Sequence, residues 1–168
     1  MFIHFIMQEK KIALNFISAH FSELDIQDQD LITNAKEAFS TAYAPYSGFL
    51  VGASVFLENG EMINGSNQEN VAYPSGLCAE RVAMFYVGAK FPEVKIKTIA
   101  VSVLSKSFDV TDVISPCGAC RQVMAEYEDK QKQSIKVLLH SPNDQVLIAN
   151  KVQDLLPFMF KSPHLKKY

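Results

Sequence analysis

Cys78-Ala79-Glu80-Arg81 and Pro116-Cys117-Gly118-Ala119-Cys120-Arg121 are the stretches that decide the fold, because together they contain all three cysteines of the chain. Each stretch lies where the sequence predicts the N-terminus of a helix. The helix dipole and the free backbone N–H groups stabilise a thiolate at such a position. A C-x-x-C pair brings two sulfurs within reach of one metal ion, and Cys78 supplies a third. The pattern predicts one metal site shared by two helix N-termini.

Three cysteine ligands are typical of a catalytic zinc site, because the fourth tetrahedral position of Zn²⁺ stays open for water. A closed structural site would need a fourth Cys or His at a matching spacing. The four histidines have no such partner nearby and are interpreted as surface or core residues: His4, His20, His140 and His164. The sequence therefore favours one zinc ion per chain, held by Cys78, Cys117 and Cys120.

Glu80 is the candidate catalytic residue. It follows Cys78 by two positions, so it can lie beside the metal without being a ligand. A carboxylate there can take a proton from water and pass it to a leaving group. The alternative is an ordinary acid in the first turn of a helix. Arg81 and Arg121 directly follow ligand cysteines, and we expect them to donate hydrogen bonds to sulfur, unless both are solvated helix charges.

Hydrophobic periodicity and turn residues predict strands that alternate with helices. Predicted helices span residues 28–43, 78–89, 116–128 and 152–156, and predicted strands span 49–57, 98–104, 135–139 and 146–149, with another starting at 62. Ser115 is the expected N-cap of the third helix. The alternation predicts an α/β sandwich, and the 168 residues predict one domain. Residues 1–25 are an unassigned extension, in which the apolar positions allow an amphipathic helix: Ile12, Phe16, Ile17 and Phe21.

The composition argues against several classes of protein. The net charge is −2 and the basic residues form no run beyond Lys166-Lys167, so no nucleic-acid partner is expected. No apolar stretch is long enough to span a membrane, and the N-terminus lacks the features of a secretory signal. An odd number of cysteines that includes a C-x-x-C pair is typical of metal or redox chemistry in a reducing compartment. We therefore expect a cytoplasmic protein.

The chain resembles the small cytidine deaminases, the nucleoside enzymes of pyrimidine salvage, from about Ala35 to Phe160. Besides the two cysteine stretches, the resemblance rests on further segments: Tyr43-Ala44-Pro45-Tyr46-Ser47, Phe49, Val51-Gly52-Ala53, Gly65-Ser66-Asn67-Gln68-Glu69-Asn70, Tyr73 and Leu155-Leu156-Pro157. It implies a three-layer α/β/α sandwich with a central mixed five-stranded sheet. It also implies that residues 26–168 form a single zinc-dependent nucleoside deaminase domain.

The resemblance implies hydrolytic deamination of cytidine and deoxycytidine to uridine and deoxyuridine, with release of ammonia. Glu80 would carry the protons. The substrate-binding residues that the resemblance implies are Phe49, Asn67, Glu69, Tyr73, Ala79 and Phe160. Asn67 and Glu69 would hold the ribose 3′-hydroxyl, since one can donate and the other accepts. Without the resemblance, the same two residues would be interpreted as loop caps and the two phenylalanines as core.

Phe49 would pack on the pyrimidine, while Tyr73 and Phe160 would reach the site of a neighbouring subunit. The resemblance thus implies a homotetramer with shared active sites. Val71 departs from the family pattern, because a smaller residue is usual there, and the segment 106–113 differs among members.

Three other functions stay open at this point. One is a sister deaminase with another substrate, such as blasticidin S or a modified nucleoside. Another is a structural zinc module that only binds a partner. The third is a C-x-x-C redox protein, which would leave Cys78 and Glu80 unexplained.

Overall fold

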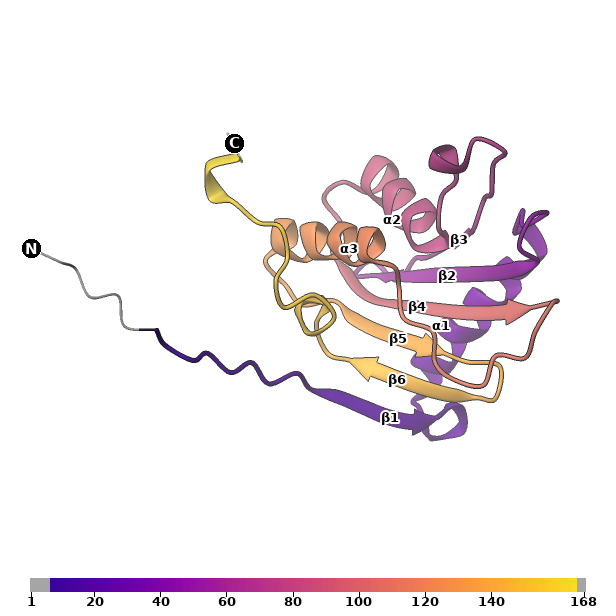
Figure 1. Cartoon of the computed structure of the whole chain (residues 1–168), viewed down its shortest axis with the longest axis horizontal. Helices are drawn as coiled ribbons and strands as arrows, with labels where there is room; N and C mark the ends of the chain where they lie inside the picture. Colours follow the sequence, from indigo (N-terminus) through magenta and orange to yellow (C-terminus); the bar gives the residue numbers. More distant parts are fainter. Residues whose placement is uncertain (1–6, 166–168) are drawn as a thin grey trace, which may run out of the picture.

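A mixed six-stranded sheet forms the middle of the computed structural model, which describes residues 7–165 (Figure 1). The strands are β1 (Phe16–His20), β2 (Phe49–Leu57), β3 (Met62–Ser66), β4 (Ile96–Ser105), β5 (Lys136–His140) and β6 (Gln145–Ala149). Their order across the sheet is β1-β6-β5-β4-β2-β3. Neighbouring strands run antiparallel, except that β4 and β5 are parallel.

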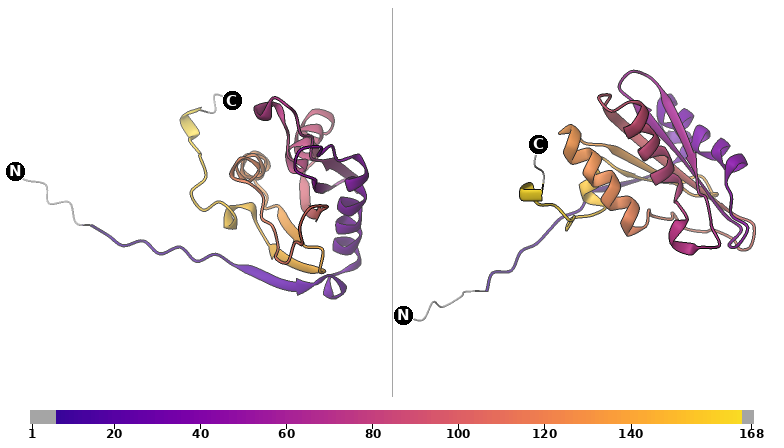
Figure 2. Two further views of the ribbon diagram at one scale, coloured as in Figure 1. Left: turned by 45° about the vertical axis from the view of Figure 1, so that its right-hand side comes forward. Right: turned by 90° about the horizontal axis from the view of Figure 1, so that it is seen from above.

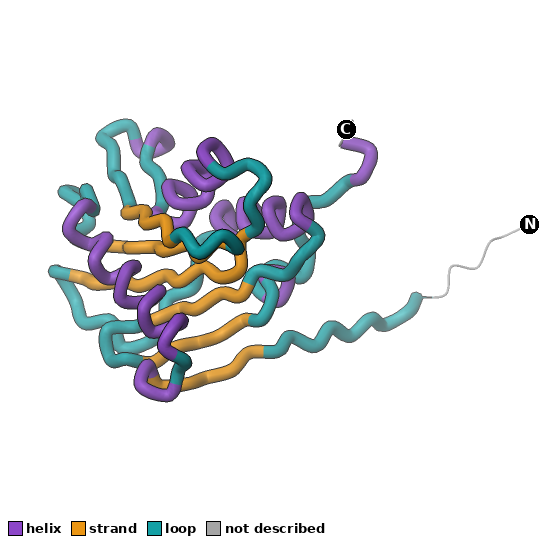
Figure 3. The backbone as a smooth tube through the Cα atoms, turned by 180° about the vertical axis from the view of Figure 1, so that it is seen from behind, coloured by secondary structure: helices purple, strands orange, loops and turns teal. Residues whose placement is uncertain are grey.

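Helices cover both faces of this sheet. Helix α1 (Ile26–Glu37) crosses one face (Figure 3), while α2 (Ala79–Lys90) and α3 (Gly118–Gln131) lie side by side on the other (Figures 1 and 2). Within residues 7–165, five short 3₁₀ turns complete the elements: Phe21–Glu23, Ala38–Thr41, Tyr73–Ser75, Val152–Asp154 and Pro163–Leu165. The predicted three-layer α/β/α sandwich is confirmed. None of the helices in the described part of the chain has both the length and the hydropathy of a membrane-spanning segment.

The sheet separates two buried apolar clusters, one beneath each layer of helices. Ile99 and Val101 of β4 belong to the cluster that also contains Met84 of α2, whereas Ala100 belongs to the cluster with Leu31 of α1. Successive residues of a strand point to opposite faces, so both faces of β4 are buried. This burial explains why β4 is almost wholly apolar.

The N-terminal extension contains a strand where its apolar positions had allowed a helix. Residues 16–20 form β1, which pairs with β6, and the N–H of Phe21 donates to the carbonyl of Asp144 at 2.8 Å. An edge strand offers unpaired backbone groups, and satisfying them outweighs a weak helical periodicity. The prediction of five strands is therefore one strand short. Residues 7–15 project away from the sheet (Figure 1), and residues 1–6 lie outside the described part.

The two helices beside the cavity described below begin at cysteines. Cys78 is the N-cap of α2, and Cys117 is the N-cap of α3, so the prediction of Ser115 as that cap is wrong. Helix α2 packs very closely on β3, because a Cβ atom at Gly65 would lie 2.6 Å from the backbone nitrogen of Ala83. Only glycine permits this approach, which fixes the first turn of α2 against the sheet.

Candidate active site

A cavity of about 870 Å³ opens where the N-terminal ends of α2 and α3 meet the start of β2. Its walls come from the loop that enters β2, the segment after β3, the first turn of α2 and the residues before α3. Several residues singled out from the sequence line this cavity: Phe49, Asn67, Glu69, Tyr73, Cys78, Glu80, Arg81 and Cys117. A space of this size accommodates a small organic molecule.

The three cysteine sulfurs lie together at the base of the two helices. All three Sγ atoms are within 4.8 Å of one another, with 3.9 Å between Cys78 and Cys117 and 3.5 Å between Cys117 and Cys120. A tetrahedral zinc ion with Zn–S bonds of about 2.3 Å holds its sulfurs about 3.8 Å apart. The thiols therefore fit one zinc ion. In the described part of the chain, no fourth metal-binding side chain joins this cluster.

The acidity of these thiols also favours a cation among them. Contact with the Cys120 sulfur, and then the Arg81 guanidinium, lower the pKa of Cys78 to about 5. The same contact with Cys78, together with burial, raises the pKa of Cys120. Three crowded thiols cannot all ionise by themselves, because each thiolate opposes the next. A dication removes this conflict, and thiolates are the form that binds zinc.

Glu80 is a buried carboxyl beside the thiols. Only 4% of its surface is exposed, yet it lines the cavity. Burial raises its pKa to about 7, and the charge on Cys78 adds to this rise. Its Oε2 atom has no hydrogen-bond partner among the described residues. A buried polar atom without a partner is unusual in a folded protein and indicates a group that acts on a ligand.

The two arginines that follow ligand cysteines do different things. Arg81 donates from Nη2 to the sulfur of Cys78 at 3.6 Å, as expected. Arg121 donates instead to two carbonyl oxygens, that of Pro116 at 2.7 Å and that of Leu155 at 3.2 Å. The expected sulfur contact of Arg121 is therefore not met. Its guanidinium thus links the segment before Cys117 to the segment that follows the 3₁₀ turn at Val152–Asp154.

Hydrogen bonds fasten Asn67 and Glu69, in the segment after β3, to the start of β2 and to the loop before it. The Asn67 side chain accepts from the N–H of Val51 and donates to the carbonyl of Phe49, both at 2.8 Å. The Glu69 carboxylate accepts the Ser47 hydroxyl and the N–H groups of Ser47 and Tyr46. These hydrogen bonds, the Ser47 hydroxyl first, lower the pKa of Glu69. Both residues line the cavity, and both side chains keep donor or acceptor capacity beyond these contacts.

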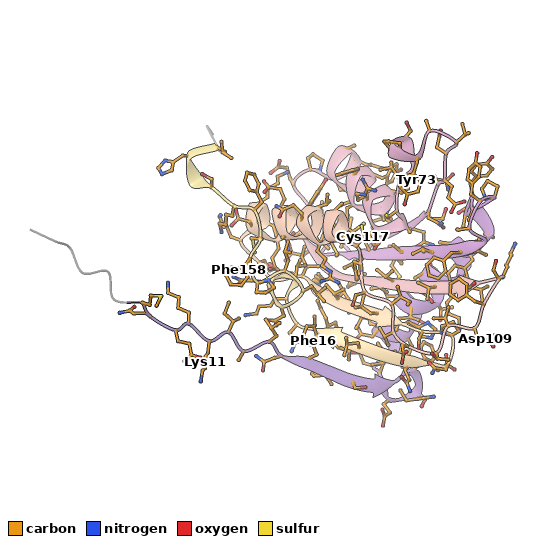
Figure 4. All side chains as sticks on the ribbon, in the orientation of Figure 1. Lys11, Phe16, Tyr73, Asp109, Cys117 and Phe158 are labelled. Atoms are coloured by element: carbon orange, nitrogen blue, oxygen red, sulfur yellow. The ribbon has the colours of Figure 1, made fainter. Side chains whose placement is uncertain are left out.

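The other residues expected to bind substrate lie in contrasting places. Ala79 is fully buried in the first turn of α2, and Phe49 is half-buried at the start of β2. Tyr73 is 91% exposed at the rim of the cavity, and Phe160 is 73% exposed and does not line it. Tyr73 and Phe158, two residues before Phe160, lie on opposite sides of Cys117 (Figure 4).

Sequence reasoning missed two residues that shape this site. Ser47 binds Glu69, and its place in the Tyr43–Ser47 motif could have indicated this. Phe108 stacks on Phe49 with 5.9 Å between ring centroids, and no signal in its loop pointed to it.

Comparison with known families decides where the chain belongs. Residues 25–135 match the family model described as the cytidine and deoxycytidylate deaminase zinc-binding region. The chain belongs to this family. The match includes both helix starts that carry the cysteines, so the family's zinc-binding region coincides with the thiol cluster. Together they give one zinc ion per chain.

Members of the family are similar to this chain in sequence and in structure. The cytidine deaminase of Halalkalibacterium halodurans is 43% identical over 98 residues, 58% of this chain and 70% of the relative. The cytidine deaminase of Mycobacterium tuberculosis H37Rv is 32% identical over 81% of this chain and 91% of its own length. A crystal structure of cytidine deaminase from Burkholderia pseudomallei, 38% identical, superposes with a TM-score of 0.67 over 78% of this chain and 97% of that chain.

Proposed function

We propose that this protein deaminates cytidine and deoxycytidine by hydrolysis, forms uridine and deoxyuridine, and releases ammonia for pyrimidine salvage. One observation carries the proposal. A buried carboxyl with an unpaired oxygen lies beside a three-thiol zinc cluster, in a cavity large enough for a nucleoside. The relatives named as cytidine deaminases, up to 43% identical, support this choice over blasticidin S or a structural zinc module.

Glu80 is the proton carrier in this proposal. Cys78, Cys117 and Cys120 would hold the zinc ion, which would supply Lewis acidity at the site. The Oε2 atom of Glu80 takes a proton from the attacking water and passes protons to the ring nitrogen and the leaving amine. A pKa of about 7 suits both directions of transfer at physiological pH. Arg81 keeps Cys78 ionised through its 3.6 Å contact with the sulfur.

The electrostatics of the cavity favour a free nucleoside over a nucleotide. Glu69, with its lowered pKa, presents a negative charge at the proposed ribose end. Arg81 is the one basic side chain among the residues that line the cavity, and it is already engaged with Cys78. A phosphate would therefore meet repulsion without a compensating cation. Asn67 and Glu69 are proposed to hold the ribose hydroxyl, and Phe49 to pack on the base.

We further propose that the active sites are shared in a homotetramer in the cytoplasm. Tyr73 and Phe160 are large aromatic residues with 91% and 73% of their surface exposed, so both are accessible to another subunit. Neighbouring subunits would cover both, with Phe160 reaching the cavity of another copy. The deaminase domain is proposed to span residues 26–168, with β1 as an added strand at the edge of its sheet.

An absorbance assay on purified protein tests the proposal. Cytidine and deoxycytidine should lose absorbance with time, while the 5′-phosphate of deoxycytidine should be a poor substrate. A chelator should stop the reaction, and added zinc should restore it. If cytidine stays unchanged under zinc-loaded conditions, the proposed activity is wrong. Light scattering measures the assembly state, and a fully active monomer would contradict shared sites.

A further inference from the structure

A second phenylalanine supports Phe49 from outside the cavity. The rings of Phe49 and Phe108 stack nearly parallel, with 5.9 Å between centroids and 7° between planes. Phe49 lines the cavity and Phe108 does not. Phe49 is the first residue of β2 and Phe108 lies in the loop after β4, so the two rings are far apart in the sequence. Phe108 therefore contacts a residue of the site without reaching the space where substrate would bind.

The backbone around Phe108 is anchored to the strand that carries Phe49. Ser105 lies opposite Phe49 in the β2–β4 register, and its Oγ accepts the N–H groups of Ser107 and Phe108, both at 3.1 Å. These bonds turn the chain sharply after β4. The turn places the Phe108 ring against Phe49 rather than in solvent.

The loop that enters β2 is tied to the same turn. The N–H of Lys106 donates to the carbonyl of Gly48 at 3.1 Å, and the Ser107 hydroxyl donates to the carbonyl of Ser47 at 3.3 Å. Gly48 has a φ of +65°, and a Cβ atom there would lie 2.8 Å from the Ser107 oxygen. The left-handed φ therefore favours glycine where the two loops meet. Because Ser47 also binds Glu69, the turn after β4 supports both the base end and the ribose end of the cavity.

We propose that Phe108 is a positioning residue that fixes the ring plane of Phe49 for packing against the pyrimidine. The inference rests on the proposed function, since it assigns Phe49 to the base. Phe49 is only half-buried, so its ring needs a second contact to hold one orientation. Phe108 is itself 57% exposed and belongs to neither buried apolar cluster, so it can be replaced without opening the core. Its contribution is to substrate binding rather than to the chemical step.

Steady-state kinetics of Phe108 variants test this role. Phe108→Leu keeps an apolar side chain but removes the ring, and Phe108→Tyr keeps the ring. An offset aromatic pair contributes free energy beyond that of its buried area, so Phe108→Leu should raise the KM for cytidine roughly two- to tenfold. The kcat should change less than about twofold, because uniform binding is lost. Phe108→Tyr should restore the wild-type KM. Phe16→Leu, which removes a partly exposed ring on the edge strand β1 and outside the cavity lining, is the matched control and should leave KM unchanged.

A double-mutant cycle decides whether Phe108 acts through Phe49. In a Phe49→Leu background, Phe108→Leu should cause no further rise in KM. An unchanged KM in Phe108→Leu would overturn the inference. So would a rise in KM in the Phe49→Leu background as large as the rise in the wild-type background. In either case, cytidine turnover by the wild type would still uphold the proposed function. A fall in kcat without a rise in KM would also overturn it. Absence of turnover by the wild type would instead refute the proposed function and remove the basis for this role.

Discussion

Replacement of Glu80 by Gln separates chemistry from structure at this site. Gln has nearly the same shape as Glu, so the buried volume and the packing of α2 are preserved. The side chain is 4% exposed and its pKa is raised to about 7 by burial, so the ionised form is disfavoured in the fold. An uncharged amide should therefore cost little stability. Because the three cysteines, and not Glu80, form the metal-binding cluster, zinc should stay bound.

The expected loss is in turnover. A positioned general acid or base contributes about 10²- to 10⁴-fold, and Glu80 would serve in both the attack and the departure of ammonia. We expect kcat to fall by about 10³- to 10⁴-fold, which corresponds to about 4–5.5 kcal/mol in the activation barrier. KM should change little, because the amide does not alter the walls that Phe49, Asn67 and Glu69 provide.

Absorbance assays on cytidine, metal analysis and thermal unfolding measure the three quantities together. Glu61→Gln is the control, since Glu61 is exposed on the turn between β2 and β3. A Glu80→Gln variant that turns over cytidine at the wild-type rate would refute the assigned role. A variant that loses zinc or unfolds would show instead that the carboxyl serves the fold.

Three further predictions concern the fold and the metal. The Glu128 carboxylate accepts three backbone N–H groups outside the cavity. Glu128→Gln should therefore lower the free energy of unfolding by about 1–3 kcal/mol and leave kcat unchanged. An unchanged urea midpoint would contradict this prediction. Burial lowers the pKa of His140 below its usual 6.5, so the unfolded chain binds more protons than the folded one as pH falls through 6.5, and the free energy of unfolding should decrease as pH is lowered below about 7. His140→Gln should flatten that dependence in urea unfolding, and an equally steep dependence would exclude His140 as its source. Chelation of zinc should lower Tm by roughly 5–10 °C, as expected for loss of a ligand at about 100 times its Kd, and an unchanged Tm would speak against a buried zinc site.

Local patterns predicted most of the fold because they report local physics. The strand at 49–57 and the helix at 78–89 agree with β2 and α2 to within a residue at each end. The helix predicted at 28–43 ends at Glu37 and continues as a 3₁₀ turn to Thr41, where the chain must bend toward β2. The spacing of apolar residues cannot distinguish an α-helical turn from a 3₁₀ turn.

Features that depend on distant contacts could not be predicted in the same way. β1 exists because β6 offers an unpaired edge, which no local pattern in residues 16–20 records. The three cysteines could be grouped from their spacing and residue type, and the structure brings them together. The bonds that fix Asn67 and Glu69 to the loop before β2, and the stack of Phe108 on Phe49, join segments that only the folded sheet places side by side.

Zinc titration of metal-free protein tests the central claim most directly. Cytidine turnover should be absent before zinc is added, rise in proportion to bound zinc, and level off at one zinc ion per chain. Full turnover before any zinc is added, or a plateau far from one ion per chain, would contradict a single three-cysteine site that drives the deamination.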